Sequence, residues 1–281
     1  MVNTGDDFDY LGLRICPDLD TVCYTLAGLA NPVTGWGREN ETWQVLGHLT
    51  ALGGPSWFKL GDADLATHLE RTRRLASGES LSGVVRGLCE TWKVPVGVLP
   101  MSDQSVSTIV HTREHGELAF QEYFVKYACA PVVTRFEFRG IEEAQPAPGV
   151  LEAIRATDTV LICPSNPWVS IAPILAIAGI REAIQGKKVV AVSPIIGGKA
   201  IKGPAAKMFQ ELGVPPSALA VAEQYRAFLS GFVLDEVDQA LESEVRRWGI
   251  IPFVTNTIMT NPIDRQRLAS EIVAFCEPSG G

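Results

Sequence analysis

The second half of the chain alternates short apolar runs with amphipathic stretches, and this alternation constrains the fold more than any other feature. The predicted strands are 159–163, 188–193, 231–235 and 250–254, and the predicted helices are 171–184, 204–212, 239–248 and 264–275. Strands that alternate with helices of this length are typical of a parallel sheet covered by helices. We therefore expect an α/β fold with a doubly wound, mostly parallel, Rossmann-like sheet.

The middle of the chain has a different pattern. Three stretches with helical spacing follow one another without a clear strand between them, at 41–52, 64–76 and 80–92. Two strand-like runs then flank a polar turn, as in a hairpin, and a third alternates like a half-exposed strand; these runs are 106–110, 118–120 and 135–139. We expect a helical and hairpin insertion over about residues 38–140 within a single domain, 1–281.

Composition excludes several classes of protein. The 281 residues are 46% hydrophobic, which is enough for a sizeable core. The formal net charge is −8 and no basic block stands out, so no nucleic-acid partner is expected. The six cysteines form no CxxC pair, which suits reduced thiols. No signal peptide begins the chain, and the longest apolar run, 169–180, is too short for a bilayer. We expect a soluble, cytoplasmic protein without a membrane partner.

Carboxylates are concentrated near the N-terminus. Asp6 and Asp7 end the segment 3–7, and Asp18 and Asp20 lie in the segment 17–21, both beside turn-forming residues. Close carboxylates repel each other and usually need a cation or hydrogen-bond donors nearby. Magnesium prefers oxygen ligands of this kind and often shares them with substrate phosphates.

Two loops follow predicted strands, where open parallel sheets bind ligands. Ser165 and Asn166 come directly after the strand 159–163, and Ser170 fits the N-cap of the next helix. Free amides at a helix start can hold a phosphate, although these residues can equally build a simple turn. A glycine-bearing loop around Gly197 has lysines at 199 and 202 but lacks the Walker A spacing, so an ordinary surface loop remains the alternative.

Two further motifs have a simple structural explanation. In the segment 60–68, Asp62 or Asp64 can cap the helix that follows, with Thr67 and His68 one turn later. The H-x-x-E-H pattern at 111–115 needs a helix to bind zinc, but it falls at the expected hairpin tip and is interpreted as structural. From residues alone, the chain reads as an α/β enzyme that handles a phosphate-containing ligand with a magnesium-like ion.

An ordered set of short segments goes further than any one motif. These segments are Asn-Thr-Gly-Asp-Asp at 3–7, Pro-Asp-Leu-Asp-Thr at 17–21, Gly-Trp-Gly at 35–37, Leu-Gly-Asp-x-Asp-Leu-Ala-Thr-His at 60–68, Pro-Met-Ser-Asp at 100–103, Pro-Ser-Asn-Pro-x-x-Ser-Ile at 164–171 and Ser-Pro-Ile-Ile-Gly at 193–197. Together they closely resemble the 2-phospho-L-lactate transferase (CofD/FbiA) family of coenzyme F-420 biosynthesis. The resemblance extends from residue 2 to the last helix.

The resemblance implies an activity. Members of the family take a guanylyl-activated donor, lactyl-diphosphoguanosine or its enolpyruvyl relative. They transfer the phospho-lactyl or phosphoenolpyruvyl group to the side-chain hydroxyl of the deazaflavin Fo, which gives F-420-0 or its dehydro form and GMP. Magnesium is required. Nothing in the sequence distinguishes the two donors, and a homodimer is expected only by resemblance.

The resemblance also implies roles for individual residues. Asp6, Asp18 and Asp20 are expected to hold Mg²⁺, and Asp18 and Asp20 to be catalytic, with Asp20 orienting or deprotonating the Fo hydroxyl. The substrate-binding residues are expected to be Asp20, Asp62, Ala63, Thr67, Ser165, Asn166, Ser170 and Gly197. Those on the Ser165/Asn166 loop and the Gly197 loop would face the guanylyl donor.

Two departures from the family pattern bear on activity. The family's usual first strand and Gly-rich loop, a natural phosphate cradle, do not precede the segment 3–7, so we expect an N-terminally truncated chain of poor stability and low activity. Relatives often carry Arg or Lys where this chain has Ala63. Two alternatives follow: a nucleotide-sugar-binding regulatory protein of related fold, or an inactive truncated paralogue.

Overall fold

A computed structural model describes residues 1–277, which form two compact units. The first unit comprises Met1–Leu151 and Ala172–Ile180, and the second comprises Glu152–Ile171 and the chain from Arg181 onwards. Whether the chain is one domain with an insertion at about 38–140 stays a prediction, and each unit is described by itself.

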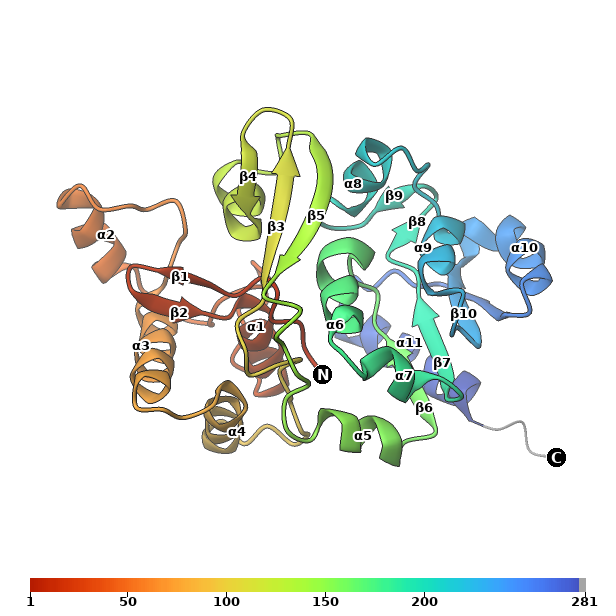
Figure 1. The fold of residues 1–281 in the computed structure, drawn as a ribbon, viewed down its shortest axis with the longest axis horizontal. Coiled ribbons are helices and arrows are strands. Elements are labelled where there is room, and N and C mark those ends of the chain that lie inside the picture. Colours follow the sequence, from red (N-terminus) through yellow and green to blue (C-terminus); the bar gives the residue numbers. More distant parts are fainter. Residues whose placement is uncertain (278–281) are drawn as a thin grey trace. The chain divides into compact units, whose positions relative to one another are not determined.

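The second unit is built on a parallel sheet whose strands lie in the order β11-β10-β7-β6 (Figure 1). Their bounds are β6 Thr159–Ile162, β7 Lys188–Val192, β10 Gly231–Asp235 and β11 Ile251–Thr255. All residues of β10 are buried, as expected for an inner strand covered on both faces. The sheet register pairs Val190 with Leu161 and with Gly231. The α/β class and the parallel sheet predicted from the alternation are confirmed.

Helices complete the second unit. They are η2 Pro167–Ile171, α7 Ile180–Ile184, α8 Ala205–Glu211, α9 Ala218–Tyr225, η3 Glu236–Leu241, α10 Glu242–Arg247 and α11 Pro262–Cys276, with the short hairpin β8 Ile195–Ile196 and β9 Lys199–Ala200. Leu268 and Ile272 of α11 pack on Val190 and Val233 of the sheet. The sequence pattern did not reveal α9, a helix of 8 residues whose N-cap is Ser217.

The first unit combines a helical layer with small antiparallel sheets. Its helices are α1 Pro17–Leu26, α2 Gln44–Ala51, α3 Asp62–Ala76, α4 Leu81–Thr91, η1 Glu122–Lys126 and α6 Ala172–Ala176, and α5 Val150–Ala156 begins in this unit. Its strands are the ribbon β1 Phe8–Tyr10 and β2 Leu13–Ile15 and the sheet β3 Ser107–Thr112, β4 Gly116–Ala119 and β5 Val133–Arg139, in the order β4-β3-β5. The three predicted helices and the predicted hairpin are confirmed.

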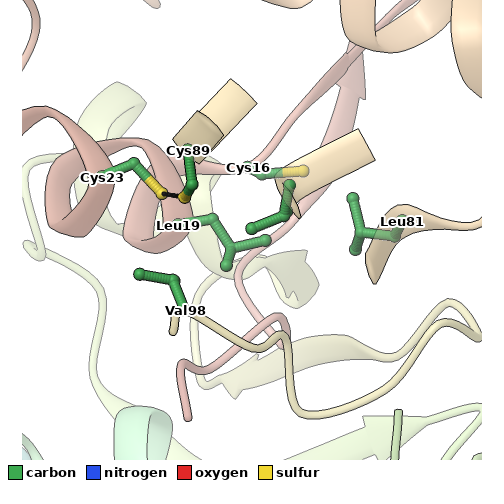
Figure 2. Close-up of a cluster of buried hydrophobic side chains, with 7 residues drawn as sticks. Cys16, Leu19, Cys23, Leu81, Cys89 and Val98 are labelled. Atoms are coloured by element: carbon green, nitrogen blue, oxygen red, sulfur yellow. Dashed lines mark hydrogen bonds between the residues drawn. The ribbon is translucent and has the colours of Figure 1, made fainter. Parts of the chain in front are cut away.

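An apolar cluster fixes α1 in the first unit (Figure 2). Leu19 and Cys23 lie one turn apart on α1 and pack against Leu81 and Cys89 of α4. The Sγ atoms of Cys23 and Cys89 are 3.5 Å apart. This packing uses one face of α1 and leaves other faces of the same helix for polar side chains.

Two predicted helices differ from the structure. The stretch predicted as one helix, 171–184, is divided into the end of η2, α6 and α7. Gly179 adopts a φ of 83°, which ends the helical path because an α-helix needs negative φ. The stretch 239–248 begins as a 3-10 helix and becomes α-helical only from Glu242. Between residues 1 and 277, no helix has both the length and the apolar character that a bilayer crossing requires.

Candidate active site

The segment before β1 turns sharply and directs two carboxylates inward. Asn3 Oδ1 accepts a hydrogen bond from the Gly5 amide at 2.8 Å, which closes the turn. A Cβ at Gly5 would lie 2.7 Å from Thr108 Oγ1, so only glycine fits this approach. Asp6 and Asp7 follow and are only 5% and 2% exposed. The local sequence therefore places two acidic groups in the interior of the first unit.

The second acidic segment is the first turn of α1. Pro17 occupies the start of the helix, where its missing N–H costs nothing, and Asp18 and Asp20 lie in the same turn. Carboxylates are favoured there because they face the positive end of the helix dipole. Asn3 Nδ2 donates to Asp18 Oδ2 at 3.0 Å and so connects the two acidic segments. Burial raises the pKa of Asp18, and burial together with the nearby Asp18 charge raises the pKa of Asp6.

Several oxygen atoms at this place are suited to a hard cation. Burial raises the pKa of Asp7 to about 7, although Arg14, whose Nη2 is 3.9 Å away, partly opposes this effect. Within residues 1–277, hydrogen-bond partners are lacking for the buried atoms Asp6 Oδ1, both Asp7 Oδ atoms, Thr4 Oγ1 and Thr108 Oγ1. Buried polar atoms without partners are costly, and Mg²⁺ binds carboxylate and hydroxyl-type oxygens. The chemistry of these donors therefore fits a magnesium ion.

Asp20 points to a different face of α1 and meets α3. Arg71 Nη2 donates to Asp20 Oδ1, and Arg71 Nη1 lies 3.2 Å from His68 Nδ1. On the other side of the ring, His68 Nε2 is 3.5 Å from Asp64 Oδ1, to which the Tyr24 hydroxyl donates at 2.7 Å. Burial raises the pKa of Asp20, while the Arg71 charge opposes that rise. Asp20 therefore has an internal counter-charge in hydrogen-bond contact, unlike Asp6 and Asp18.

The predicted acceptor residues Asp62 and Ala63 belong to a reciprocal pair of helix caps. Asp62 accepts hydrogen bonds from the amides of Gln44 and Val45, both at 3.0 Å, and so caps α2. Glu41 Oε1 in turn accepts from the Ala63 amide at 2.7 Å and caps α3. The structural interpretation of Asp62 as a cap is thus correct, but the capped helix is α2 and not α3. Each cap satisfies amides that would otherwise lack partners.

A small pocket lies beside the start of α3, with a cavity volume of only about 20 Å³. Trp36 and Trp43 line it and are 46% and 42% exposed, which is high for such apolar side chains. The Arg38 guanidinium carbon is 5.6 Å from the centre of the Tyr24 ring. The lining residues are Asn31, Thr34, Trp36, Gly37, Arg38, Glu41, Trp43, Gly61 and Asp64. Asp64 therefore belongs both to this pocket and to the contacts around Asp20. Thr67 is buried, with its Oγ1 2.8 Å from the Tyr24 hydroxyl.

The predicted donor residues lie in the second unit. Asn166 Oδ1 accepts from the Trp168 amide at 3.0 Å, and Asn166 Nδ2 is 3.1 Å from Met208 Sδ. Ser170 was predicted as an N-cap, but it lies inside η2 and its amide donates to the Asn166 carbonyl at 3.0 Å. Asn166 performs the capping because its short side chain reaches an amide two residues on. Ser165 is half-buried in the same loop.

The Gly197 loop offers fewer free amides than the sequence implied. Gly197 has a φ of 54°, and its amide donates to Asp238 Oδ2 at 3.0 Å. A phosphate at this amide would compete with the buried Asp238 carboxylate. Lys199 and Lys202 are both exposed.

The H-x-x-E-H residues have structural contacts in the β3–β4 hairpin. His111 Nε2 is 2.9 Å from a Glu137 oxygen on the neighbouring strand, and the His115 and Tyr127 ring centres are 4.5 Å apart with the rings tilted by 33°. Glu114 accepts from the Val132 amide at 2.8 Å. The two imidazoles do not share a helix face, as the zinc pattern would need, so the structural interpretation of this motif is correct.

Sequence reasoning missed the partners of Asp20. Arg71 was not considered, and His68 was regarded as structural. A signal was present, because Asp64, Thr67, His68 and Arg71 follow the i, i+3, i+4, i+7 spacing of one helix face. A buried face with this much polarity is unusual and indicates a functional or tightly paired site.

Comparisons with known proteins identify the family. The family model described as 2-phospho-L-lactate transferase CofD matches residues 1–270. The chain is 45% identical over 282 aligned positions to the phosphoenolpyruvate transferase of Streptomyces griseus, covering 98% of this chain and 89% of that one. It is 41% identical to the 2-phospho-L-lactate transferase of Methanosarcina acetivorans, again covering 98% and 89%.

A solved structure supports the fold. A protein member of the UPF0052 family from Bacillus halodurans superposes with a TM-score of 0.61 at 12% identity, covering 96% of this chain and 89% of that chain. This likeness shows that the two proteins share an α/β fold. The family match decides the class: the chain belongs to the CofD family of 2-phospho-L-lactate transferases and is a transferase.

Proposed function

We propose that this protein transfers a phosphoenolpyruvyl or phospho-lactyl group from a guanylyl-activated donor to the side-chain hydroxyl of the deazaflavin Fo. The acceptor oxygen forms a bond to the phosphorus distal to guanosine, the bridging P–O bond breaks, and GMP leaves with the electron pair. The products are F-420-0 or its dehydro form and GMP. The enolpyruvyl donor is preferred in this proposal, because the relative at 45% identity is named a phosphoenolpyruvate transferase.

One observation carries the proposal beyond the family match. Asp6 and Asp7 are buried with carboxylate oxygens that lack hydrogen-bond partners within residues 1–277, and the neighbouring Asp18 is half-buried. We assign the magnesium ion to Asp6 and Asp18, with Asp20 as a further candidate ligand. When bound, the ion would neutralise donor diphosphate oxygens and the charge that develops on GMP.

The protein's own residues supply the remaining steps. Asp20 Oδ2 is buried and accepts no hydrogen bond within residues 1–277, and in this proposal it is the atom that orients the acceptor hydroxyl and takes its proton. Burial raises the pKa of Asp20, which makes its ionised form a stronger base. The exposed side chains of Trp36 and Trp43 are assigned to the flat deazaflavin ring, since exposed aromatic faces stack on planar ligands.

The substrate-binding residues divide between the two substrates. Asp20, Asp62, Ala63 and Thr67 are assigned to the acceptor, and Ser165, Asn166, Ser170 and Gly197 to the guanylyl donor. The cap contacts of Asp62 and Asn166 make their action indirect, through the loops that they hold. Transfer then depends mainly on positioning, because phosphoryl-type transfer leaves little covalent chemistry to the protein.

The test is Fo-dependent release of GMP in the presence of Mg²⁺, with each donor in turn. The Streptomyces griseus relative serves as the positive control, and Asp9→Asn, an exposed change on β1, as the control variant. We expect turnover that Asp18→Asn and Asp20→Asn abolish and Asp9→Asn preserves. Full activity of Asp20→Asn would remove its catalytic role. Tight binding of a UDP-sugar without Fo binding or GMP release would refute the transferase proposal.

A further inference from the structure

Arg71 differs from the other arginines of α3 in its surroundings. Arg73 and Arg74 reach outward and pair with Glu70 and Glu79, as surface helices commonly do. Arg71 is only 1% exposed and is among the largest fully buried side chains of the described residues. A buried guanidinium needs acceptors for its donors, because an unpaired buried charge is very costly. The contacts it makes are therefore informative.

The contacts of Arg71 determine which oxygen of Asp20 is free. Nη2 donates to Asp20 Oδ1, and Nη1 is 3.2 Å from the carbonyl oxygen of Arg14 on β2. The contact with the Arg14 carbonyl fixes the plane of the Arg71 guanidinium, which in turn fixes the orientation of the Asp20 carboxylate. Asp20 Oδ2 then lies 3.6 Å from His68 Nδ1, beyond hydrogen-bond distance, and has no partner within residues 1–277. One oxygen of Asp20 is held by Arg71, and the other is buried without a hydrogen-bond partner.

The same guanidinium also determines the proton position on His68. Arginine can only donate hydrogen bonds, so the Nδ1 atom that lies 3.2 Å from Nη1 must act as an acceptor. A neutral imidazole that accepts at Nδ1 carries its proton on Nε2. This Nε2–H faces Asp64 Oδ1 at 3.5 Å. The Nε2 proton of His68 therefore points toward the carboxylate of Asp64.

Asp64 connects these contacts to the pocket. Asp64 lines the pocket together with Trp36 and Trp43. Its Oδ1 accepts a hydrogen bond from the Tyr24 hydroxyl at 2.7 Å, and its amide donates to Glu41 Oε2 at 3.1 Å. Burial raises the pKa of Asp64, but contacts with His68 and Tyr24 outweigh burial, and the pKa is lowered overall. An ionised Asp64 completes a continuous row of polar groups from buried Asp20 to the pocket.

We propose that Arg71 is a positioning residue that holds Asp20 by one oxygen and sets His68 as the Nε2–H tautomer facing Asp64, thereby aligning the buried carboxylate with the acceptor pocket. The proton position on His68 is independent of the reaction. The effect of Arg71 on turnover rests on the proposed function. Lysine at 71 keeps the charge but loses the planar fork that engages Asp20, His68 and the carbonyl together.

The tautomer can be measured without any substrate. The chain has four histidines, so ¹⁵N-histidine labelling and two-bond ¹⁵N–¹H correlation spectra give few signals, and His68→Asn identifies the one from residue 68. We expect a pyridine-like Nδ1 and a pyrrole-like Nε2 for His68 in the wild-type protein. Arg71→Lys and Arg71→Met should shift that signal, and Arg73→Met, an exposed change on the same helix, should leave it unchanged. A proton on Nδ1 in the wild-type protein would overturn the proposal.

Kinetics test the second half of the inference. Loss of an outer partner that orients a metal-ligating side chain typically costs about ten- to hundred-fold in activity, and we expect a loss of that size here. Arg71→Lys should lower kcat by that factor with little change in the KM for the donor, while Arg73→Met keeps both constants. A wild-type kcat in Arg71→Lys would refute positioning even if GMP release confirms the enzyme. The Nε2–H tautomer in a protein that releases no GMP would support the positioning arrangement and refute the proposed function.

Discussion

Replacing Asp7 with asparagine should stabilise the protein above neutral pH. Burial raises the pKa of Asp7 from 3.8 in the unfolded chain to about 7 in the folded one. Between these values the unfolded chain releases a proton that the folded chain keeps, so the free energy of unfolding falls as pH rises and levels off above 7. At about 1.4 kcal/mol per pKa unit, the difference corresponds to roughly 4 kcal/mol as an upper figure.

Asparagine removes this pH-dependent cost while keeping the shape of the side chain. Urea unfolding of wild type and Asp7→Asn, without divalent ions, should therefore give stabilities that separate progressively between pH 5 and pH 8, with the variant more stable at pH 8. Asp9→Asn is the matched control, because Asp9 is exposed and also lies near Arg14, at 3.6 Å. Its effect should stay within about 0.5 kcal/mol. Parallel pH curves for wild type and Asp7→Asn would show that this carboxyl is not protonated in the folded protein.

Three other predictions concern the same site and its supports. Magnesium should raise the Tm of the wild type more at pH 8 than at pH 6, because ionised Asp6 and Asp18 bind it; an equal rise in Asp18→Asn would argue against that assignment. Glu41→Ala and Gly61→Ala should each cost about 1 kcal/mol in urea unfolding, since both displace the cap of α3; a Cβ at Gly61 would lie 1.8 Å from Glu41 Cγ. The double variant should cost little more than either single change, and additive losses would contradict a shared cap. Asn166→Ala should raise the KM for the guanylyl donor and leave the KM for Fo within about twofold, which steady-state GMP release would decide.

The parallel sheet was predictable because its strands are apolar on both faces. Buried strands such as 188–192 read as continuous apolar runs, and the helices between them have clear spacing. The ribbon of β1 and β2 escaped detection because each strand has only 3 residues, too few for a period to show. Helix α1 escaped because the acidic residues of its first turn were interpreted as possible metal ligands beside turn-forming residues. Both are places where tertiary contacts decide the structure.

The candidate site was predictable in its acidic half and not in its basic half. Asp6, Asp18 and Asp20 stand out in the sequence because they are concentrated beside turn formers in two short segments. Arg71 does not stand out, since it shares a charged stretch with Arg73 and Arg74 and only burial distinguishes it. Asp20 and Arg71 are 51 residues apart in the sequence, so no local sequence pattern could reveal their contact.

Helix α1 explains why such an unfavourable cluster can persist. Burial raises the pKa of both Asp18 and Asp20, which means that their charged forms oppose folding. The apolar face of the same helix opposes that cost, because Leu19 and Cys23 are almost fully buried against α4. Fully burying a side chain of this kind contributes roughly 1.5–3 kcal/mol. The carboxylates of the site and the apolar side chains that anchor the helix therefore alternate along α1. A substitution on the apolar face should displace the carboxylates even though it makes no direct contact with them.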